Sequence, residues 1–338
     1  MIRLKKLKLI QYFFMINVIT FVFLLVGFVF LIKGADLLVE GASSVAKKFG
    51  VSALVIGLTI VAFGTSAPEL IVNIFASIQG NTDIAIGNIL GSNIANILLI
   101  LGISAVIFPL AVKKGTVWKE IPLCLLAIIV AGLMANDMLI DGISFSALTR
   151  IDGLILISFF IIFLYYTFGI SKAEGEAEET VIKERSVIKS IAMVVVGLVG
   201  LTLGGKWIVD SAVVVAESFG VSQAVIGLTI VAIGTSLPEL VTSAVAAFKK
   251  NADIAIGNIV GSNIFNVFWI LGASAIISPL PFSSVLMRDM IVAIIATLLL
   301  FIFMFVGKKH ILERWQGVCF ILAYIIYIVV IVGQEIIK

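Results

Sequence analysis

The sequence is poor in charge, histidine and cysteine, and each shortage removes a class of function. Only 13% of the 338 residues are charged, against about 25% in a soluble domain, so we expect a membrane protein. One histidine, His310, leaves no histidine cluster for catalysis, and we expect no enzyme. Cys124 and Cys319 lie inside apolar runs, where thiols pack as small hydrophobic side chains. The net charge of +3 is too small and too dispersed to indicate nucleic-acid binding.

Long apolar runs recur from end to end and predict an all-α membrane protein. A helix needs about 20 apolar residues to cross a bilayer. The run that follows the basic N-terminus is longer than a signal peptide, and we expect it to be retained as the first helix. Ten membrane helices are expected near residues 15–48, 52–79, 83–108, 118–135, 151–170, 187–218, 222–248, 252–279, 286–306 and 315–334.

The chain contains an internal repeat. Residues 57–96 read GLTIVAFGTSAPELIVNIFASIQGNTDIAIGNILGSNIAN, and residues 227–266 read GLTIVAIGTSLPELVTSAVAAFKKNADIAIGNIVGSNIFN, which align without a gap. The repeat predicts a first five-helix half (1–171), a short charged linker (172–186) and a second five-helix half (187–338). Because five is odd, the second half must enter the membrane from the opposite side, which gives inverted-topology repeats.

Basic residues predict the orientation of the chain. Most lysines and arginines fall in loops on the same side as the linker, so the positive-inside rule places the linker in the cytoplasm. The basic N-terminal tail does not follow this rule. We expect a multi-pass protein of the plasma membrane.

One glutamate stands in the same place in each copy of the repeat. Glu69 and Glu239 lie in apolar segments that contain no lysine or arginine. An ionised carboxylate inside a membrane costs several kcal/mol unless something compensates it. Either a cation from solution balances each carboxylate, or each is protonated and hydrogen-bonded to a neighbouring helix. The occurrence of the same setting twice favours the cation.

Both glutamates belong to a GTSxPE motif. Pro68 has no N–H, and its ring clashes with the carbonyl of Gly64, so the helix is expected to break near that glycine. Thr65 and Ser66 add hydroxyl oxygens beside Glu69. The corresponding residues of the second copy are Thr235, Ser236, Pro238 and Glu239. We expect the second, third, seventh and eighth helices to be broken around a central ion site.

A second motif, GNxxGSNxxN, follows each GTSxPE. Asn88, Ser92 and Asn96 are spaced by four and form one polar stripe on a helix. These amides either hold helices together or line the ion site, and we favour the second role for Asn96 and Asn266. Carboxylate, amide, hydroxyl and carbonyl oxygens are the ligands that Ca²⁺ takes. Two negative charges are matched by one Ca²⁺ or by two Na⁺, so competition for them would produce exchange.

The motif pairs GTSAPE with GNILGSNIAN, and GTSLPE with GNIVGSNIFN, resemble the two alpha-repeats of the calcium/cation antiporter superfamily. The compact, prokaryotic-type Na⁺/Ca²⁺ exchangers are the branch that the chain is most similar to. The resemblance implies alternating access, with the first and sixth helices sliding across the other helices. It also implies Ca²⁺ extrusion driven by Na⁺ entry, with more than one Na⁺ per Ca²⁺. The ion ligands implied are Thr65, Ser66, Glu69, Ser92, Asn96, Thr235, Ser236, Glu239, Ser262 and Asn266, with the main-chain carbonyls of Ala62 and Ala232.

Two other functions stay open at this point. A H⁺/Ca²⁺ antiporter on the same fold would use the glutamates to carry protons, and a cation channel would use them without coupling. Some relatives, including K⁺-dependent exchangers, carry aspartate where this chain has Asn266, so asparagine in both repeats disfavours a K⁺ requirement without deciding it. We expect no cofactor and no obligatory protein partner, only the lipid bilayer and the transported ions Na⁺ and Ca²⁺.

Overall fold

The computed structural model describes residues 2–140, 142, 144–171, 185–218 and 232–337. Within these residues eight helices are long and apolar enough to cross a membrane, and a bent pair of shorter helices makes a ninth. The expected span near 222–248 lies partly outside the described residues, which contain its later part. The chain is therefore a membrane protein with a helical fold, as its composition predicts.

The helices of the first half follow the expected order. They are α1 (Ile2–Phe49), α2 (Ala53–Ile56), the π-helix η1 (Gly57–Val61), α3 (Ala62–Thr65), α4 (Ala67–Ile78), α5 (Thr82–Ile94), the π-helix η2 (Ala95–Leu101), α6 (Gly102–Ile107), α7 (Lys114–Trp118), α8 (Glu120–Met134), α9 (Asp137–Ile140) and α10 (Arg150–Ser171). Those described in the second half are α11 (Val187–Ser218), α13 (Ala232–Thr235), α14 (Leu237–Phe248), α15 (Ala252–Phe265), the π-helix η4 (Asn266–Leu271), α16 (Gly272–Ile277), α17 (Ser284–Phe303) and α18 (Arg314–Ile337).

The second membrane helix is broken where the proline predicts it. α3 ends at Thr65, α4 begins at Ala67, and the two segments are bent by 47°. Pro68 lies in the first turn of α4, where its missing N–H costs little. The second half repeats this arrangement, because α13 ends at Thr235 and α14 begins at Leu237, one residue before Pro238.

The prediction that the third and eighth helices are also broken is wrong. Thr82–Ile107 and Ala252–Ile277 each form one continuous span of 26 residues. Neither segment contains a proline, so no ring clash interrupts the backbone. Instead, each span widens into a π-helical segment, η2 or η4, that begins at the end of its GNxxGSNxxN motif. A π-helical segment shifts the following residues around the helix axis without breaking the helix.

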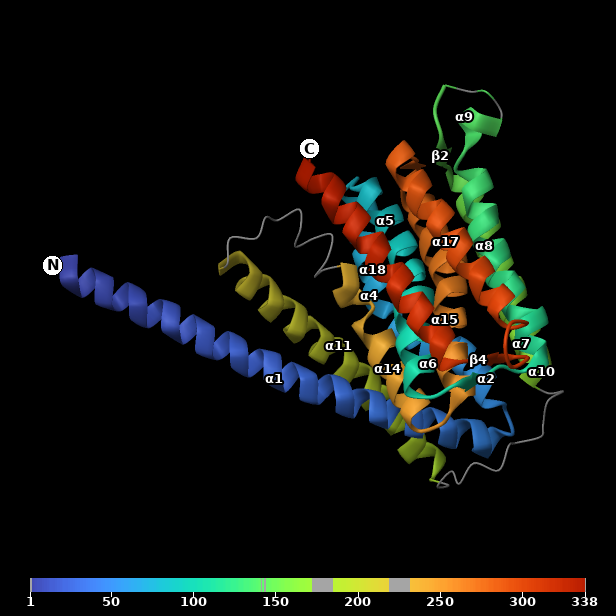
Figure 1. The fold of residues 1–338 in the computed structure, drawn as a ribbon, viewed down its shortest axis with the longest axis horizontal. Helices are drawn as coiled ribbons and strands as arrows, with labels where there is room; N and C mark the ends of the chain where they lie inside the picture. Colours follow the sequence, from blue (N-terminus) through green and yellow to red (C-terminus); the bar gives the residue numbers. More distant parts are fainter. Residues whose placement is uncertain (1, 141, 143, 172–184, 219–231, 338) are drawn as a thin grey trace.

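α1 and α11 lie side by side and run obliquely to the other helices (Figure 1). Glycines let their backbones touch. A Cβ at Gly34 would lie 2.8 Å from the carbonyl oxygen of Gly197, and a Cβ at Gly204 would lie 2.7 Å from that of Gly27. Close backbone approach through small residues is the usual way in which membrane helices associate, so these two helices form one packed pair.

Two pairs of very short strands lie at opposite ends of the bundle (Figure 1). β1 (Leu110–Ala111) pairs with β4 (Ile311–Leu312), and β2 (Ala147–Leu148) pairs with β3 (Leu280–Pro281), both antiparallel. α8 leads from β1 towards β2, whereas α17 leads from β3 towards β4. Because β1 is beside β4 and β2 is beside β3, α8 and α17 run in opposite directions, although they occupy corresponding places in the two halves.

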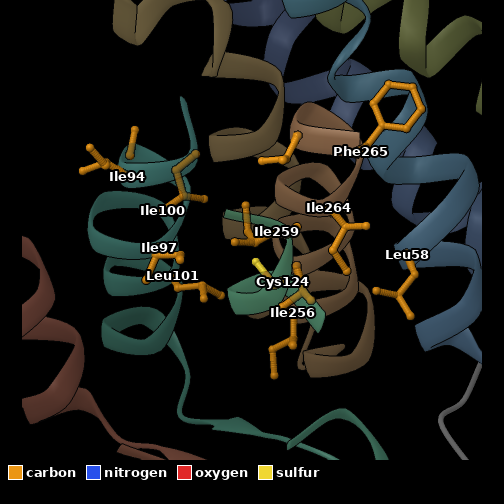
Figure 2. Packing of buried hydrophobic residues seen from close by; sticks show 14 of the residues in the cluster. Leu58, Ile94, Ile97, Ile100, Leu101, Cys124, Ile256, Ile259, Ile264 and Phe265 are labelled. Carbon is orange, nitrogen blue, oxygen red and sulfur yellow. The ribbon is translucent and has the colours of Figure 1, made fainter. Parts of the chain in front are cut away.

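The centre of the bundle is formed by the two spans that carry the GNxxGSNxxN motifs. In their most apolar 18-residue stretches, 78% and 94% of the chain is buried, whereas in the corresponding stretch of α18 only 22% is buried. Figure 2 shows Ile94 and Ile97 on one of these spans, Ile259 and Ile264 on the other, and Cys124 on α8, which packs against the second span. Cys124 packs there as a small hydrophobic residue, as predicted, while Cys319 is exposed. The polar motifs are therefore held in the part of the bundle that is furthest from lipid.

Candidate ion site

The two motif glutamates lie at equivalent positions beside the helix breaks. Glu69 is in the first turn of α4 and Glu239 is in the first turn of α14. Each side chain is only 1% exposed. A helix N-terminus carries a partial positive charge, so both breaks aim a favourable dipole at a carboxylate. The break that each proline causes thus also provides part of the electrostatic support for the acid that follows it.

The serine of each GTSxPE motif donates to the glutamate of the other half. Ser66 Oγ donates to Glu239 Oε1 at 2.8 Å, and Ser236 Oγ donates to Glu69 Oε1 at 3.2 Å. Ser66 precedes Glu69 in its own half, and Ser236 precedes Glu239, yet each serine donates to the glutamate of the other half. The two carboxylates therefore meet in one site, and neither is fully hydrogen-bonded by its own half.

The serines of the GNxxGSNxxN motifs complete the contacts to the carboxylates. Ser92 Oγ donates to Glu69 Oε1 at 3.3 Å, and Ser262 Oγ donates to Glu239 Oε1 at 3.5 Å. Ser92 Oγ also lies 3.2 Å from Ser236 Oγ, which joins the two halves a second time. All four predicted serines thus surround the two glutamates.

Four buried oxygens of the site have no hydrogen-bond donor within the described residues. They are Glu69 Oε2, Glu239 Oε2, Asn96 Oδ1 and Asn266 Oδ1. A buried acceptor without a donor costs about 1–3 kcal/mol, and more when it is charged. The ion pairs of the described residues all involve other acids, such as Asp36 and Glu40. A set of unpaired hard oxygens with two carboxylates is the surrounding that a bound cation requires.

The set of donors also limits the kind of cation. In the described parts of the chain, no three histidine, cysteine, aspartate or glutamate side chains gather around one point. Any cation here is held by two carboxylates and neutral oxygens. Soft metals prefer thiolate and imidazole, whereas carboxylate, amide and hydroxyl oxygens suit hard cations such as Ca²⁺.

The threonine hydroxyls predicted as ligands donate to asparagines, and each also interacts with the glutamate of the other half, Thr65 with Glu239 and Thr235 with Glu69. Thr65 Oγ1 donates to Asn258 Oδ1 at 3.0 Å and to the carbonyl of Ala62 at 3.3 Å. Thr235 Oγ1 donates to Asn88 Oδ1 at 3.5 Å. The Ala62 carbonyl also accepts the backbone N–H of Ser66 at 3.0 Å, so both of its lone pairs are used. Ala232, whose carbonyl was predicted as the corresponding ligand, is the first residue of α13.

Asn88 and Asn258 connect helices within their own halves. Asn88 Nδ2 donates to Asn73 Oδ1 at 2.6 Å, and Asn258 Nδ2 donates to Ser243 Oγ at 2.9 Å. Asn73 Nδ2 in turn donates to the carbonyl of Ala85 at 2.9 Å. These bonds tie α4 to α5 and α14 to α15, which supports the helix-joining role for this asparagine of each motif.

The sequence reasoning assigned no role to Asn93 and Asn263, yet both contact the predicted site residues. Asn96 Nδ2 donates to Asn263 Oδ1, and Asn266 Nδ2 donates to Asn93 Oδ1. The signal was present in the sequence, because the GSN triplet containing each asparagine occurs in both copies. Its meaning depended on knowing that the two copies face each other.

Comparison with known proteins gives consistent results. The sequence model of the sodium/calcium exchanger protein family matches residues 19–169 and again residues 189–333. Sodium/calcium exchanger MaX1 of Methanosarcina acetivorans is 35% identical over 322 residues, covering 86% of this chain and 91% of that protein. Inner membrane protein YrbG of Escherichia coli is 38% identical over 246 residues, covering 70% and 73%. A solved structure of the sodium-calcium exchanger NCX_Mj, soaked with Na⁺ and Ca²⁺, has a TM-score of 0.79 and 36% sequence identity over 92% of this chain and 97% of that chain.

Proposed function

The chain belongs to the sodium/calcium exchanger family, and on this premise we propose that it exchanges Na⁺ for Ca²⁺ across the plasma membrane. Members of this family are transporters and not enzymes. In the proposed direction, Na⁺ entry drives Ca²⁺ extrusion. The observation that carries the proposal is the set of four buried, unpaired oxygens, two of which belong to carboxylates.

The proposed ligands fall into a primary and a supporting group. The primary group is Glu69, Glu239, Asn96, Asn266 and the four serines Ser66, Ser92, Ser236 and Ser262. The supporting group is Thr65, Thr235 and the carbonyls of Ala62 and Ala232. The threonine oxygens keep lone pairs for a cation while they donate, whereas the Ala62 carbonyl would first have to give up a hydrogen bond. Ca²⁺ takes six to eight oxygens in flexible geometry, and the primary group supplies that number. One Ca²⁺ or two Na⁺ would neutralise the two carboxylates, so the ions compete for the same charge.

The direction of α8 and α17 supports an inverted pair of repeats, 1–171 and 187–338, joined by the linker 172–186. A site between inverted halves can open to either side of the membrane by one type of movement. α11 is placed to take part, because a side chain at Gly64 would clash with Leu198, and one at Gly234 would clash with Val209. The packed α1–α11 pair therefore touches both helix breaks, where a shift would alter access to the site.

The strand pairs support the grouping of loops by side on which the proposed cytoplasmic position of the linker rests. β1 and β4 join two loops that the positive-inside rule places in the cytoplasm, and β2 and β3 join two loops that it places outside. Paired strands must lie on one side of the membrane, and these pairs agree with the predicted sides. The ten-helix, multi-pass topology follows from the same assignment.

A flux assay with the purified chain in proteoliposomes tests the proposal. Ca²⁺ uptake is measured with Na⁺ inside the vesicles, with Na⁺, K⁺ and H⁺ gradients imposed one at a time and the membrane potential clamped. We expect uptake only when a Na⁺ gradient is present, at constant pH and without K⁺. Uptake that follows a pH gradient alone would replace the proposal with H⁺/Ca²⁺ antiport. Ca²⁺ movement without Na⁺ counterflow would indicate a channel and overturn exchange.

A further inference from the structure

Four buried asparagines form a hydrogen-bonded ring where the two central spans cross. We call this the asparagine ring, and its members are Asn93, Asn96, Asn263 and Asn266. Asn93 Nδ2 donates to the backbone carbonyl of Asn263 at 3.4 Å, and Asn263 Nδ2 donates to that of Asn93 at 3.2 Å. Asn266 Nδ2 donates to Asn93 Oδ1 at 3.0 Å, and Asn96 Nδ2 donates to Asn263 Oδ1 at 2.8 Å. None of the four is more than 4% exposed.

The two backbone carbonyls determine how every amide in the ring is turned. A carbonyl oxygen only accepts hydrogen bonds, so Asn93 and Asn263 must each point Nδ2 at the carbonyl of the other. Their Oδ1 atoms then face the next amide, which must offer its own Nδ2. As a consequence Asn96 and Asn266 turn their NH₂ groups into the ring, and their Oδ1 atoms are left without donors.

These unpaired amide oxygens lie on the side of the spans that carries the ion site. Asn96 follows Ser92 by one helical turn, and Ser92 contacts Glu69. Asn266 stands in the same relation to Ser262, which contacts Glu239. If either amide were turned around, it would present N–H donors to a cation in place of a ligand oxygen.

We propose that Asn93 and Asn263 are positioning residues that act crosswise on the ion site. Asn93 holds Asn266, and Asn263 holds Asn96, so that the amide oxygen of each is turned towards the cation. The inference rests on the proposed function, because it assumes a cation between Glu69 and Glu239. It assigns a role in cation affinity to two residues that do not themselves contact the ion.

Double-mutant cycles with Ca²⁺ binding as the readout test the crossed arrangement. Equilibrium Ca²⁺ binding is measured on the purified full-length chain in detergent, with Na⁺ as competitor. We expect Asn93→Ala to weaken Ca²⁺ binding by about 10- to 100-fold, as is typical when a residue that orients a metal ligand is lost. Combined with Asn266→Ala, it should add little, because the amide that it orients is already absent. Combined with Asn96→Ala, it should multiply the two single effects.

The matched control is the mirror set, in which Asn263→Ala should be non-additive with Asn96→Ala and multiplicative with Asn266→Ala. This set also serves if Asn93→Ala does not fold. A general packing role would give the same result with Asn96→Ala as with Asn266→Ala. Multiplicative effects in all four double variants would therefore overturn the positioning role alone. So would unchanged Ca²⁺ binding in both Asn93→Ala and Asn263→Ala. Wild-type protein that binds neither Ca²⁺ nor Na⁺ would overturn the proposed function and this inference with it.

Discussion

Replacing Glu69 by glutamine removes one of the two charges of the site and keeps almost the same side-chain shape. The amide oxygen of glutamine can still accept from Ser92 and Ser236, as Glu69 Oε1 does at 3.3 and 3.2 Å. The unpaired Oε2, however, is replaced by an NH₂ group, which donates and cannot bind a cation. The substitution thus removes a ligand oxygen and a unit of negative charge without opening a cavity.

The expected loss follows from the burial of the site. Removing one partner of a buried charge pair costs about 3–5 kcal/mol, which corresponds to roughly two to four orders of magnitude in affinity at about 1.4 kcal/mol per tenfold. We therefore expect Ca²⁺ affinity to fall by at least about a hundredfold, and Na⁺-driven Ca²⁺ uptake to be lost. Without ions the variant should be no less stable than wild type, because it buries one fewer ionisable group.

Glu120 provides the matched control for this experiment. It is also 1% exposed and also has an unpaired Oε2, but it lies at the start of α8 and accepts a hydrogen bond from Tyr166 at 2.5 Å. Glu120→Gln should leave Ca²⁺ affinity unchanged. Equilibrium Ca²⁺ binding, uptake into proteoliposomes and thermal unfolding in ion-free detergent would be measured for both variants. Unchanged Ca²⁺ affinity in Glu69→Gln, or an equal loss in Glu120→Gln, would refute the reasoning.

Three further variants test other parts of the structure. Ser66→Ala removes the hydroxyl that donates to the glutamate of the other half, and should weaken Ca²⁺ binding about tenfold or more in the same binding assay. Pro68→Ala removes the ring that clashes with the Gly64 carbonyl, so it should straighten the break and slow Ca²⁺ uptake, with little change in the thermal unfolding temperature because the restored N–H lies in the first turn of α4. Gly204→Ala should lower that temperature, at a cost of about 1–3 kcal/mol, because the added methyl group would meet the backbone of α1. Gly205→Ala is its control, since the nearest atom to its Cβ is 3.8 Å away.

Local physics explains which features the sequence could predict. Pro68 acts on the turn that precedes it, so the position of the break was readable from one motif, and it was found there. The cost of burying an uncompensated carboxylate is equally local, so Glu69 and Glu239 could be singled out without a fold. The repeat then supplied the expectation that the two acids belong together.

Features that depend on which helices face each other could not be read in this way. The π-helical segments Ala95–Leu101 and Asn266–Leu271 replace the breaks expected in the two central spans, and no residue type marks them as proline marks a kink. The hydrogen bonds of Thr65 and Asn93 go to the opposite half of the chain. Predicting them requires the packing of two segments that are more than a hundred residues apart in sequence.

The crossed hydrogen bonds make the two half-sites depend on each other. Ser66 and Glu69 belong to one bent helix, yet the serine donates to Glu239 while the glutamate accepts from Ser236. A movement of one half against the other therefore changes the surroundings of both carboxylates at once. Without a bound cation, both acids keep unpaired oxygens. A movement that carries them through a low-dielectric environment is then costly, and a cation that neutralises them removes this cost. In the proposed exchange, the same geometry both binds the ion and couples its binding to the relative position of the halves, which is the condition for antiport as opposed to leak.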